Sequence, residues 1–417
     1  MKRISFGFLL GSAAIAVLFA GFLSAAAAED SRESGADETW AASLRLRGGY
    51  DGDPTLGAGG KRPSAFAGLD AALIAGRETA DQAAALTFES SSARYLDGSI
   101  AAAQEHKLRL DLANKDQGGV SLKLTTAAEY QASYETRAFD FYQSARVKAA
   151  SGPVRPFLTG EVRAASLNET NPISGDFFPE PQRFLRGTLI PGVALHRDDF
   201  EIGVSVNLSA TRYADELDFF GYRRDNERIQ PFLFARYRKD KLSAFAAVSR
   251  LSGDWHDAGF SDVRATLFEA SLDYDGEPVA FELAAARRAT DTTFPLSPVS
   301  IDTSFSGRAE VKLDRKSAVS FFGSHVEREF LDSPFRIRTT RYGMGFEREF
   351  AKDAVFGLEL ARVRASPIAG PIVQTLIATA SLTRRFGDVA KRAAGGMKIP
   401  PAARMPDGGG PALRGGQ

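Results

Sequence analysis

The chain has 417 residues, 44% of them hydrophobic, with 52 basic side chains, 52 acidic side chains and no cysteine. A formal net charge of +0 argues against nucleic acid as a partner, and a chain without cysteine has neither a disulfide nor a lipoprotein anchor. After the N-terminal region no segment has about 18 consecutive apolar residues, which excludes a later transmembrane helix.

The N-terminus has the pattern of a secretory signal. Lys2 and Arg3 precede a mostly apolar run from Ile4 to Leu23, and small residues follow up to Ala28. We predict a signal peptide over residues 1–28 and a short periplasmic leader over residues 29–39, with an uncleaved anchor helix as the alternative. A secreted chain of this kind is either soluble beyond the inner membrane or a barrel in the outer membrane.

Between Trp40 and Phe386 apolar and polar residues alternate in recurring segments about 19 residues apart, which suits a membrane strand plus a connection. We predict an all-β, transmembrane, antiparallel up-and-down β-barrel of about 18 strands over residues 40–386, with 16 strands as the alternative. The segments start at Trp40, Ser64, Gln82, Ala103, Gly118, Arg137, Val154, Phe184, Phe200, Arg228, Leu242, Val263, Pro278, Ile301, Ala318, Ile337, Val355 and Ile372.

A soluble β-sandwich also alternates, but three features favour lipid. The strands are longer than the five or so residues usual in sandwiches, the polar face is charged in nearly every strand, and aromatic residues gather at both strand ends. In the stretch "GGVSLKLTTAAEYQASY" we expect Leu122 and Leu124 to face lipid, and Lys123 and Glu129 to face the lumen. The predicted lipid-interface aromatics are Trp40, Tyr130, Tyr134, Phe200, Tyr274, Phe356 and Phe386.

The connections alternate in length, which predicts the orientation. Tight polar turns such as "RDD", "KDK" and "AKD" alternate with longer connections, among them residues 51–63, 166–183, 212–227 and 287–300. In outer-membrane barrels the short side is periplasmic, so both termini are expected there. We interpret residues 212–227 as a surface loop, with an inward-folded gate as the alternative. Five arginines fall on the predicted lipid face near strand ends: Arg94, Arg250 and Arg362 near the outer end, and Arg348 and Arg384 near the inner end.

The first strand runs into a Tyr-Asp-x-Asp-Pro-like loop in "WAASLRLRGGYDGDPTLGAGG", and many alternating strands follow. This arrangement resembles the beta-barrel porin family of proteobacterial outer membranes. The resemblance implies an outer-membrane barrel but no settled substrate. Some related barrels resemble the outer-membrane exits of polysaccharide export systems, so we keep an export or secretion component as the alternative function.

The last strand, "IVQTLIATASLTRRF", resembles the C-terminal recognition segment of outer-membrane proteins, which implies the barrel assembly machinery as a partner. It departs from that pattern at Arg384 and because residues follow Phe386. The tail over residues 387–417 is rich in Gly, Pro and Ala, and we predict that it is disordered in the periplasm.

The polar face predicts an aqueous channel for passive diffusion of small hydrophilic solutes. We expect a transverse field that favours anionic solutes, with neutralising cross-strand pairs as the alternative. The predicted pore-lining residues are Lys107, Arg109, Lys123, Glu129, Arg146, Lys148, Arg155, Glu161, Arg163, Arg186, Glu269, Glu282, Arg308, Glu310 and Lys312.

No pattern predicts an enzyme, a metal site or a cofactor. The histidines His106, His196, His256 and His325 show no lipase pattern and no metal-ligand spacing. The expected partners are outer-membrane lipid and lipopolysaccharide, together with the assembly machinery. A homo-oligomer stays open, and nucleic acid is not expected.

Overall fold

The computed structural model describes residues 37–56, 63–98, 102–114, 119–149, 152–171, 176–368 and 371–387. The predicted signal peptide, most of the leader and the tail beyond residue 387 therefore lie outside the described residues. Within them, no helix is long and apolar enough to cross a membrane.

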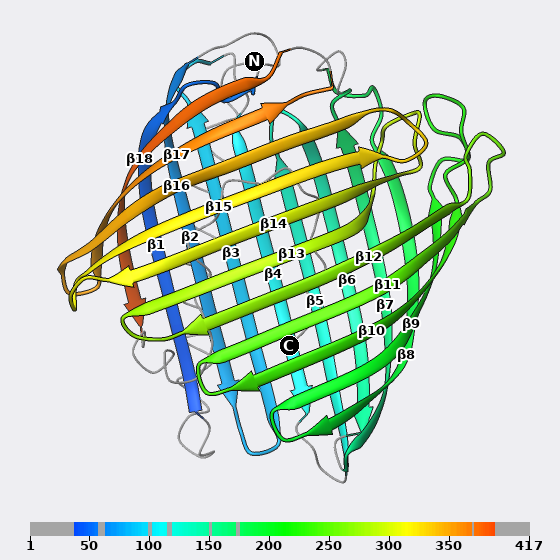
Figure 1. Ribbon diagram of the computed structural model, residues 1–417, viewed down its shortest axis with the longest axis horizontal. Coiled ribbons are helices and arrows are strands. Elements are labelled where there is room, and N and C mark those ends of the chain that lie inside the picture. Colours follow the sequence, from blue (N-terminus) through cyan, green and yellow to red (C-terminus); the bar gives the residue numbers. More distant parts are fainter. Residues whose placement is uncertain are drawn as a thin grey trace, which may run out of the picture.

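The described chain forms one sheet of 18 antiparallel strands that closes on itself (Figure 1). Each strand pairs with the next in sequence, and β1 pairs with β18 to close the ring. The strands are β1 Asp37–Asp51, β2 Ser64–Glu78, β3 Gln82–Tyr95, β4 Ala103–Asn114, β5 Val120–Ala132, β6 Thr136–Ala149, β7 Val154–Glu169, β8 Gln182–Arg197, β9 Phe200–Tyr213, β10 Asn226–Lys239, β11 Leu242–Trp255, β12 Val263–Asp275, β13 Val279–Asp291, β14 Val299–Lys312, β15 Ser317–Phe330, β16 Arg336–Ala351, β17 Ala354–Ser366 and β18 Val373–Gly387.

The predicted fold class and the count of 18 strands are confirmed. Closure gives every strand a hydrogen-bonded neighbour on both sides, which is what a hydrocarbon surrounding requires. The observed strands begin within three residues of the predicted starting points. One end of the barrel, the turn end, carries short connections; the other, the loop end, carries most of the long ones (Figure 1).

Aspartates allow the tightest turns at the turn end. Two residues join β8 to β9, β10 to β11, and β16 to β17. In these turns Asp198, Asp240 and Asp353 have φ of 50°, 48° and 59°, in the left-handed region. Aspartate tolerates this conformation better than most residues because its short side chain can bond locally, so "RDD", "KDK" and "AKD" are suited to close hairpins.

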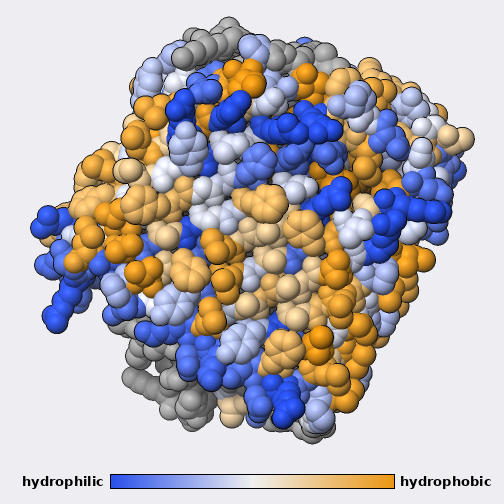
Figure 2. All heavy atoms as spheres, in the orientation of Figure 1, coloured by the Kyte–Doolittle hydropathy of each residue, from blue (hydrophilic) through white to orange (hydrophobic). Residues whose placement is uncertain are grey.

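Alternation along each strand separates two faces. On β5, Leu122 and Leu124 are 39% and 40% exposed, whereas Thr125, the residue after Leu124, is buried. On β9, Val204 is 51% exposed and Glu201 is buried. Large apolar side chains therefore cover the outside of the barrel. Figure 2 shows one side of the barrel, with a mainly apolar band across it. Exposed leucine and valine in such numbers indicate a surface that contacts lipid.

Candidate functional site

Ion pairs between distant strands identify the inner face of the barrel. Arg186 on β8 binds Asp291 at the end of β13, with Nη2 at 2.8 Å from each carboxylate oxygen. Arg328 on β15 lies 3.4 Å from Glu169 on β7. Since β8 and β13, like β7 and β15, are not neighbours in the ring, these side chains meet only across the lumen.

The strand registers then place the residues predicted from sequence. Lys123 is opposite Arg146 in the β5–β6 pair, and Arg163 is opposite Arg186 in the β7–β8 pair, so all four share the inner face. By the same alternation the whole predicted set lies on the inner face: Lys107, Arg109, Lys123, Glu129, Arg146, Lys148, Arg155, Glu161, Arg163, Arg186, Glu269, Glu282, Arg308, Glu310 and Lys312. Lys312 is at the turn end, 2.5 Å from Glu277.

Of the predicted interface aromatics, Trp40, Tyr130, Phe200, Phe356 and Phe386 are 38–49% exposed on the outer face. Tyr274 is half-buried and its ring packs beside that of Phe281. Tyr134 lies beyond the end of β5, in the connection 133–135, where its hydroxyl donates to the Glu135 carboxylate. The expectation that Tyr134 continues the outer face of the strand was therefore wrong, because β5 ends at Ala132 before reaching it.

The loop ends of β13 and β14 separate from β12 and fold into the lumen, while β14 stays paired with β15 up to Ser300. The pairing of β12 with β13 stops at Phe268 and Arg287, although both strands continue. On β14, Phe305 is 49% exposed, but Ile301 and Val299, which continue its face, have no exposed surface. We call residues 288–301 the inner hairpin.

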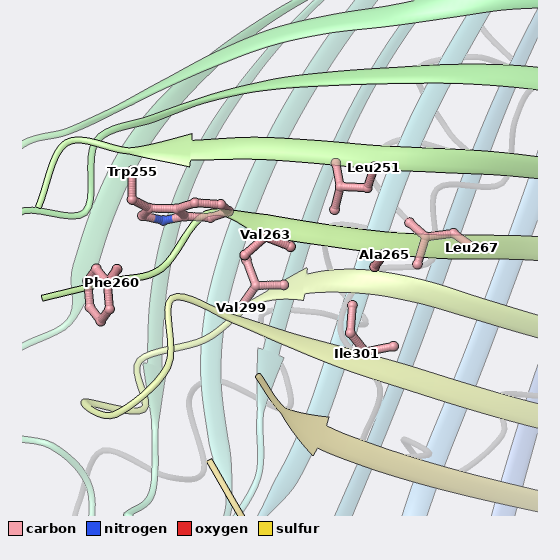
Figure 3. Packing of buried hydrophobic residues seen from close by; sticks show 8 residues of the cluster. All are labelled: Leu251, Trp255, Phe260, Val263, Ala265, Leu267, Val299 and Ile301. Carbon is pink, nitrogen blue, oxygen red and sulfur yellow. The ribbon is translucent and has the colours of Figure 1, made fainter. Parts of the chain in front are cut away.

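The outer face of the inner hairpin packs on the inner face of β11 and β12. Figure 3 shows Val299 and Ile301 beside Leu251 of β11 and Val263, Ala265 and Leu267 of β12. Burying side chains of this size contributes about 1.5–3 kcal/mol each. This apolar cluster, which also contains Trp255 and Phe260, holds the hairpin inside the barrel.

The tip of the hairpin is tied to the wall of β7–β10. Besides Arg186, Arg228 of β10 donates to Asp291 at 2.6 Å, and both arginines and the aspartate are at most 13% exposed in their side chains. Glu169 of β7 accepts hydrogen bonds from the Thr292 hydroxyl at 2.9 Å and the Thr293 backbone N–H at 2.8 Å. The inner hairpin therefore crosses part of the lumen and is anchored on the wall formed by β7–β10.

Residues 214–225, which connect β9 to β10, contribute a buried clamp to the same tip. Arg224 is 2% exposed and donates through Nη1 to the Thr292 carbonyl and through Nη2 to the Phe294 carbonyl, both at 2.9 Å. Asp218 holds its Nε at 2.7 Å. Elsewhere this loop exposes Leu217, Phe219 and Phe220. One part of this connection is a surface loop, and another part contacts the inner hairpin. The connection therefore combines features of the surface loop and the inward-folded gate that the sequence left open.

The start of the connection between β1 and β2 makes buried contacts at the seam between β1 and β18. Asp53 and Asp51, in the Tyr-Asp-x-Asp-Pro-like motif, are 0% and 3% exposed. The Asp51 carboxylate accepts from the Asp53 backbone N–H at 2.9 Å and from the Thr375 hydroxyl of β18 at 3.2 Å. The motif therefore fastens the first strand to the last at the loop end. Nearby, an inward apolar cluster contains Phe66, Ala93, Tyr95, Ala361, Val363 and Ile377.

Charge is unevenly distributed around the lumen. The inner face of β6–β10 carries eight basic side chains, namely Arg146, Lys148, Arg155, Arg163, Arg186, Arg228, Arg236 and Arg238, against four acidic ones, Asp140, Glu161, Glu169 and Glu201. The inner face of β12–β14 carries three basic side chains, Arg288, Arg308 and Lys312, against six acidic ones, Glu269, Asp273, Asp275, Glu282, Asp302 and Glu310. One sector is net positive and the other net negative.

Many of these charges are paired, whereas Arg146 is one of those without an ion pair among the described residues. Glu201 is 2.7 Å from Lys148 and 3.9 Å from Arg236. Arg146 stacks on the Phe157 ring, 4.4 Å from its centroid, and in the described part of the chain it has no ion-pair partner. Its Nε is buried without a hydrogen bond. This group leaves guanidinium donors for a passing anion.

In the described residues no group of three or more His, Cys, Asp or Glu side chains could hold a metal ion. The contacts of Asp291, Arg224, Arg228 and Glu169 were not predicted, because each joins segments far apart in the sequence and no local pattern marks them.

No family model and no curated protein matches this sequence. Among solved structures, the outer membrane protein opdK from Pseudomonas aeruginosa is 9% identical, with a TM-score of 0.43, over 83% of this chain and 99% of that chain. OccK2 (OpdF) of the same organism, in complex with glucuronate, is 8% identical, with a TM-score of 0.44, over 84% and 98%. The ferric enterobactin receptor PfeA, also from Pseudomonas aeruginosa, is 8% identical, with a TM-score of 0.45, over 84% and 80%.

The class of the protein follows from its own strand pairing and surface. A closed ring of 18 antiparallel strands with an apolar outside and a charged inside is a β-barrel of the bacterial outer-membrane type.

Proposed function

We propose that the protein is a constricted outer-membrane channel for passive diffusion of small hydrophilic solutes, with a preference for anions. In this proposal the loop end faces outward and both termini lie in the periplasm. The observation that carries the preference is Arg146, a lumen-facing guanidinium in the basic sector of β6–β10 with no carboxylate within 4 Å among the described residues.

Two features of the lumen support this proposal: a narrowing at the loop end and an excess of positive charge on β6–β10. The inner hairpin packs inside the barrel, and Leu56, at the described start of the connection between β1 and β2, packs against the inward apolar cluster; both contacts support a narrowed path at the loop end. Beyond that narrowing, Lys148, Arg146 and Arg236 surround the single carboxylate of Glu201, which leaves an excess of positive charge. Because low-dielectric walls focus fields in a narrow lumen, such an excess raises the local concentration of anions.

Reversal potentials of single channels in a KCl gradient test this proposal. Wild type should pass chloride more readily than potassium. Arg146→Gln and Arg236→Gln should each lower the chloride-to-potassium permeability ratio, and the double variant should lower it further. Arg348→Gln is the matched control, since it removes the same charge from the outer face at the turn end. A preference for potassium in the wild type would refute the proposal, as would equal ratios in all variants.

A further inference from the structure

The outer face of β11–β17 turns basic towards the loop end. On β8 and β9 the outer positions are apolar except next to the strand ends, and the two arginines at the loop end are each paired: Arg183 is 3.7 Å from Asp215, and Arg212 is 2.9 Å from Glu227. On β11–β17, arginines take several outer positions towards the loop end. They are Arg250, Arg264, Arg287, Arg336, Arg338, Arg362 and Arg364. Figure 2 shows strongly hydrophilic residues gathered above the apolar band on this face.

Four of these arginines form one cluster on two paired strands. Arg336 and Arg338 are the first and third residues of β16, and Arg362 and Arg364 lie within four residues of the end of β17. Arg364 is opposite Thr340, so it is the diagonal neighbour of Arg338. We call Arg336, Arg338, Arg362 and Arg364 the outer arginine cluster.

The outer arginine cluster has too few acceptors within the protein. Glu327 accepts from Arg338 at 2.8 Å and from Arg336 at 3.4 Å. The neighbouring Glu329 is 3.7 Å from Arg287. Arg362 donates to the side-chain oxygen of Gln374. Arg364 has no ion pair or side-chain hydrogen bond in the described part of the chain. The cluster therefore keeps a net positive charge and unused donors.

The surroundings of the cluster restrict what can bind there. Directly next to it the outer face exposes Tyr342, Met344, Leu360 and Leu376, each 45–54% exposed. These side chains contact hydrocarbon in an outer-membrane barrel. A ligand that satisfies both surfaces must have acyl chains and an anionic headgroup. The planar guanidinium fork matches the oxygens of a phosphate better than an ammonium group does.

We propose that Arg338, Arg362 and Arg364 bind a phosphate group of a phosphorylated glycolipid, lipopolysaccharide, in the outer leaflet. This proposal rests on the proposed orientation, because only an outward-facing loop end meets that leaflet. Arginine at the bilayer midplane would cost about 2–4 kcal/mol, whereas near the interface the cost falls to about 0–1 kcal/mol. A phosphate at that depth supplies the acceptors that the cluster lacks.

Native mass spectrometry of the folded barrel in detergent tests the site. The probes are diphosphorylated lipid A, the same lipid with its phosphates removed, phosphatidylglycerol and inorganic phosphate. Wild type should retain diphosphorylated lipid A in preference to the other three. The Arg362→Gln/Arg364→Gln variant should bind it about tenfold more weakly, as expected from losing charge-assisted hydrogen bonds. Heat-modifiable gel migration and unchanged conductance show that a variant is folded, and they separate failure of this site from failure of the channel.

Arg348→Gln/Arg384→Gln is the matched control, since both arginines face outward at the turn end. It should bind lipid A as wild type does. Equal retention of the dephosphorylated lipid would overturn recognition of phosphate. Equal retention of phosphatidylglycerol, or displacement of lipid A by inorganic phosphate, would overturn the assignment to a glycolipid. If both double variants lose lipid A binding to the same extent, the outer arginine cluster is not the binding site.

Discussion

Asp291 at the end of β13 should act as the latch of the inner hairpin, and Asp291→Asn tests this. The substitution keeps the size of the side chain but removes its charge. Arg186 of β8 and Arg228 of β10 then lose their shared partner while they stay at most 13% exposed. Breaking a buried ion pair by removing one partner typically costs about 3–5 kcal/mol.

That cost decides what kind of change to expect. A loss of about 3–5 kcal/mol raises the fraction of molecules whose hairpin tip is detached from the wall by about a hundredfold or more. Other contacts remain, because Arg224 still binds the carbonyls of Thr292 and Phe294, and hydrogen bonds to a charged group contribute about 1.5–3 kcal/mol each. The apolar contacts of Val299 and Ile301 with β11 and β12 also remain. The tip should therefore detach briefly and often rather than stay open.

Single-channel recording in planar bilayers distinguishes these outcomes. Wild type should give steady current, whereas Asp291→Asn should add brief excursions to a higher conductance. Glu310→Gln is the control, since it removes one inner-face carboxylate of β14 that has no ion-pair partner among the described residues. If Asp291→Asn and Glu310→Gln show the same noise and the same mean conductance as wild type, the hairpin is not held by this ion pair.

Three further predictions concern the packing of the hairpin, the loops and the lipid face. Ile301→Ala should remove about 2–5 kcal/mol of packing and speed protease cleavage within residues 292–298; unchanged cleavage rates would contradict the packing role. Hydrogen bonds from the backbone N–H groups of Arg223 and Gly259, each 2.7 Å away, lower the pKa of Asp257. The ionised Asp257 carboxylate therefore links residues 214–225 to residues 256–262. This link is complete at pH values above the usual aspartate pKa of about 3.9, and it is lost as the pH falls through the lowered pKa. The amide chemical shift of Arg223 should titrate with a midpoint below that value, and a midpoint at or above it would refute the link. Leu189→Arg should destabilise the barrel in lipid vesicles by about 2–4 kcal/mol in urea unfolding, because it places a charge in hydrocarbon at the middle of β8; a difference under about 0.5 kcal/mol would mean that Leu189 does not face lipid.

The sequence alone was sufficient for the barrel itself. Period-two alternation, as around Leu122 and Lys123, determines which face of a strand is apolar, and polar turns such as the one at Asp240 determine where strands end. Both properties are local, since they depend on residues one or two positions apart. The strand count, the antiparallel order and the two faces were therefore predictable.

Only the tertiary structure decided how the lumen is narrowed. Val299 and Ile301 continue the alternation of Phe305, so nothing in the pattern tells a hairpin that follows the wall from one that folds inward. The choice depends on Leu251 and its neighbours, which cover that face, and on Asp291, whose partner Arg186 is 105 positions away in sequence. Contacts of that separation are made by the closed ring, which brings distant strands to opposite sides of one lumen.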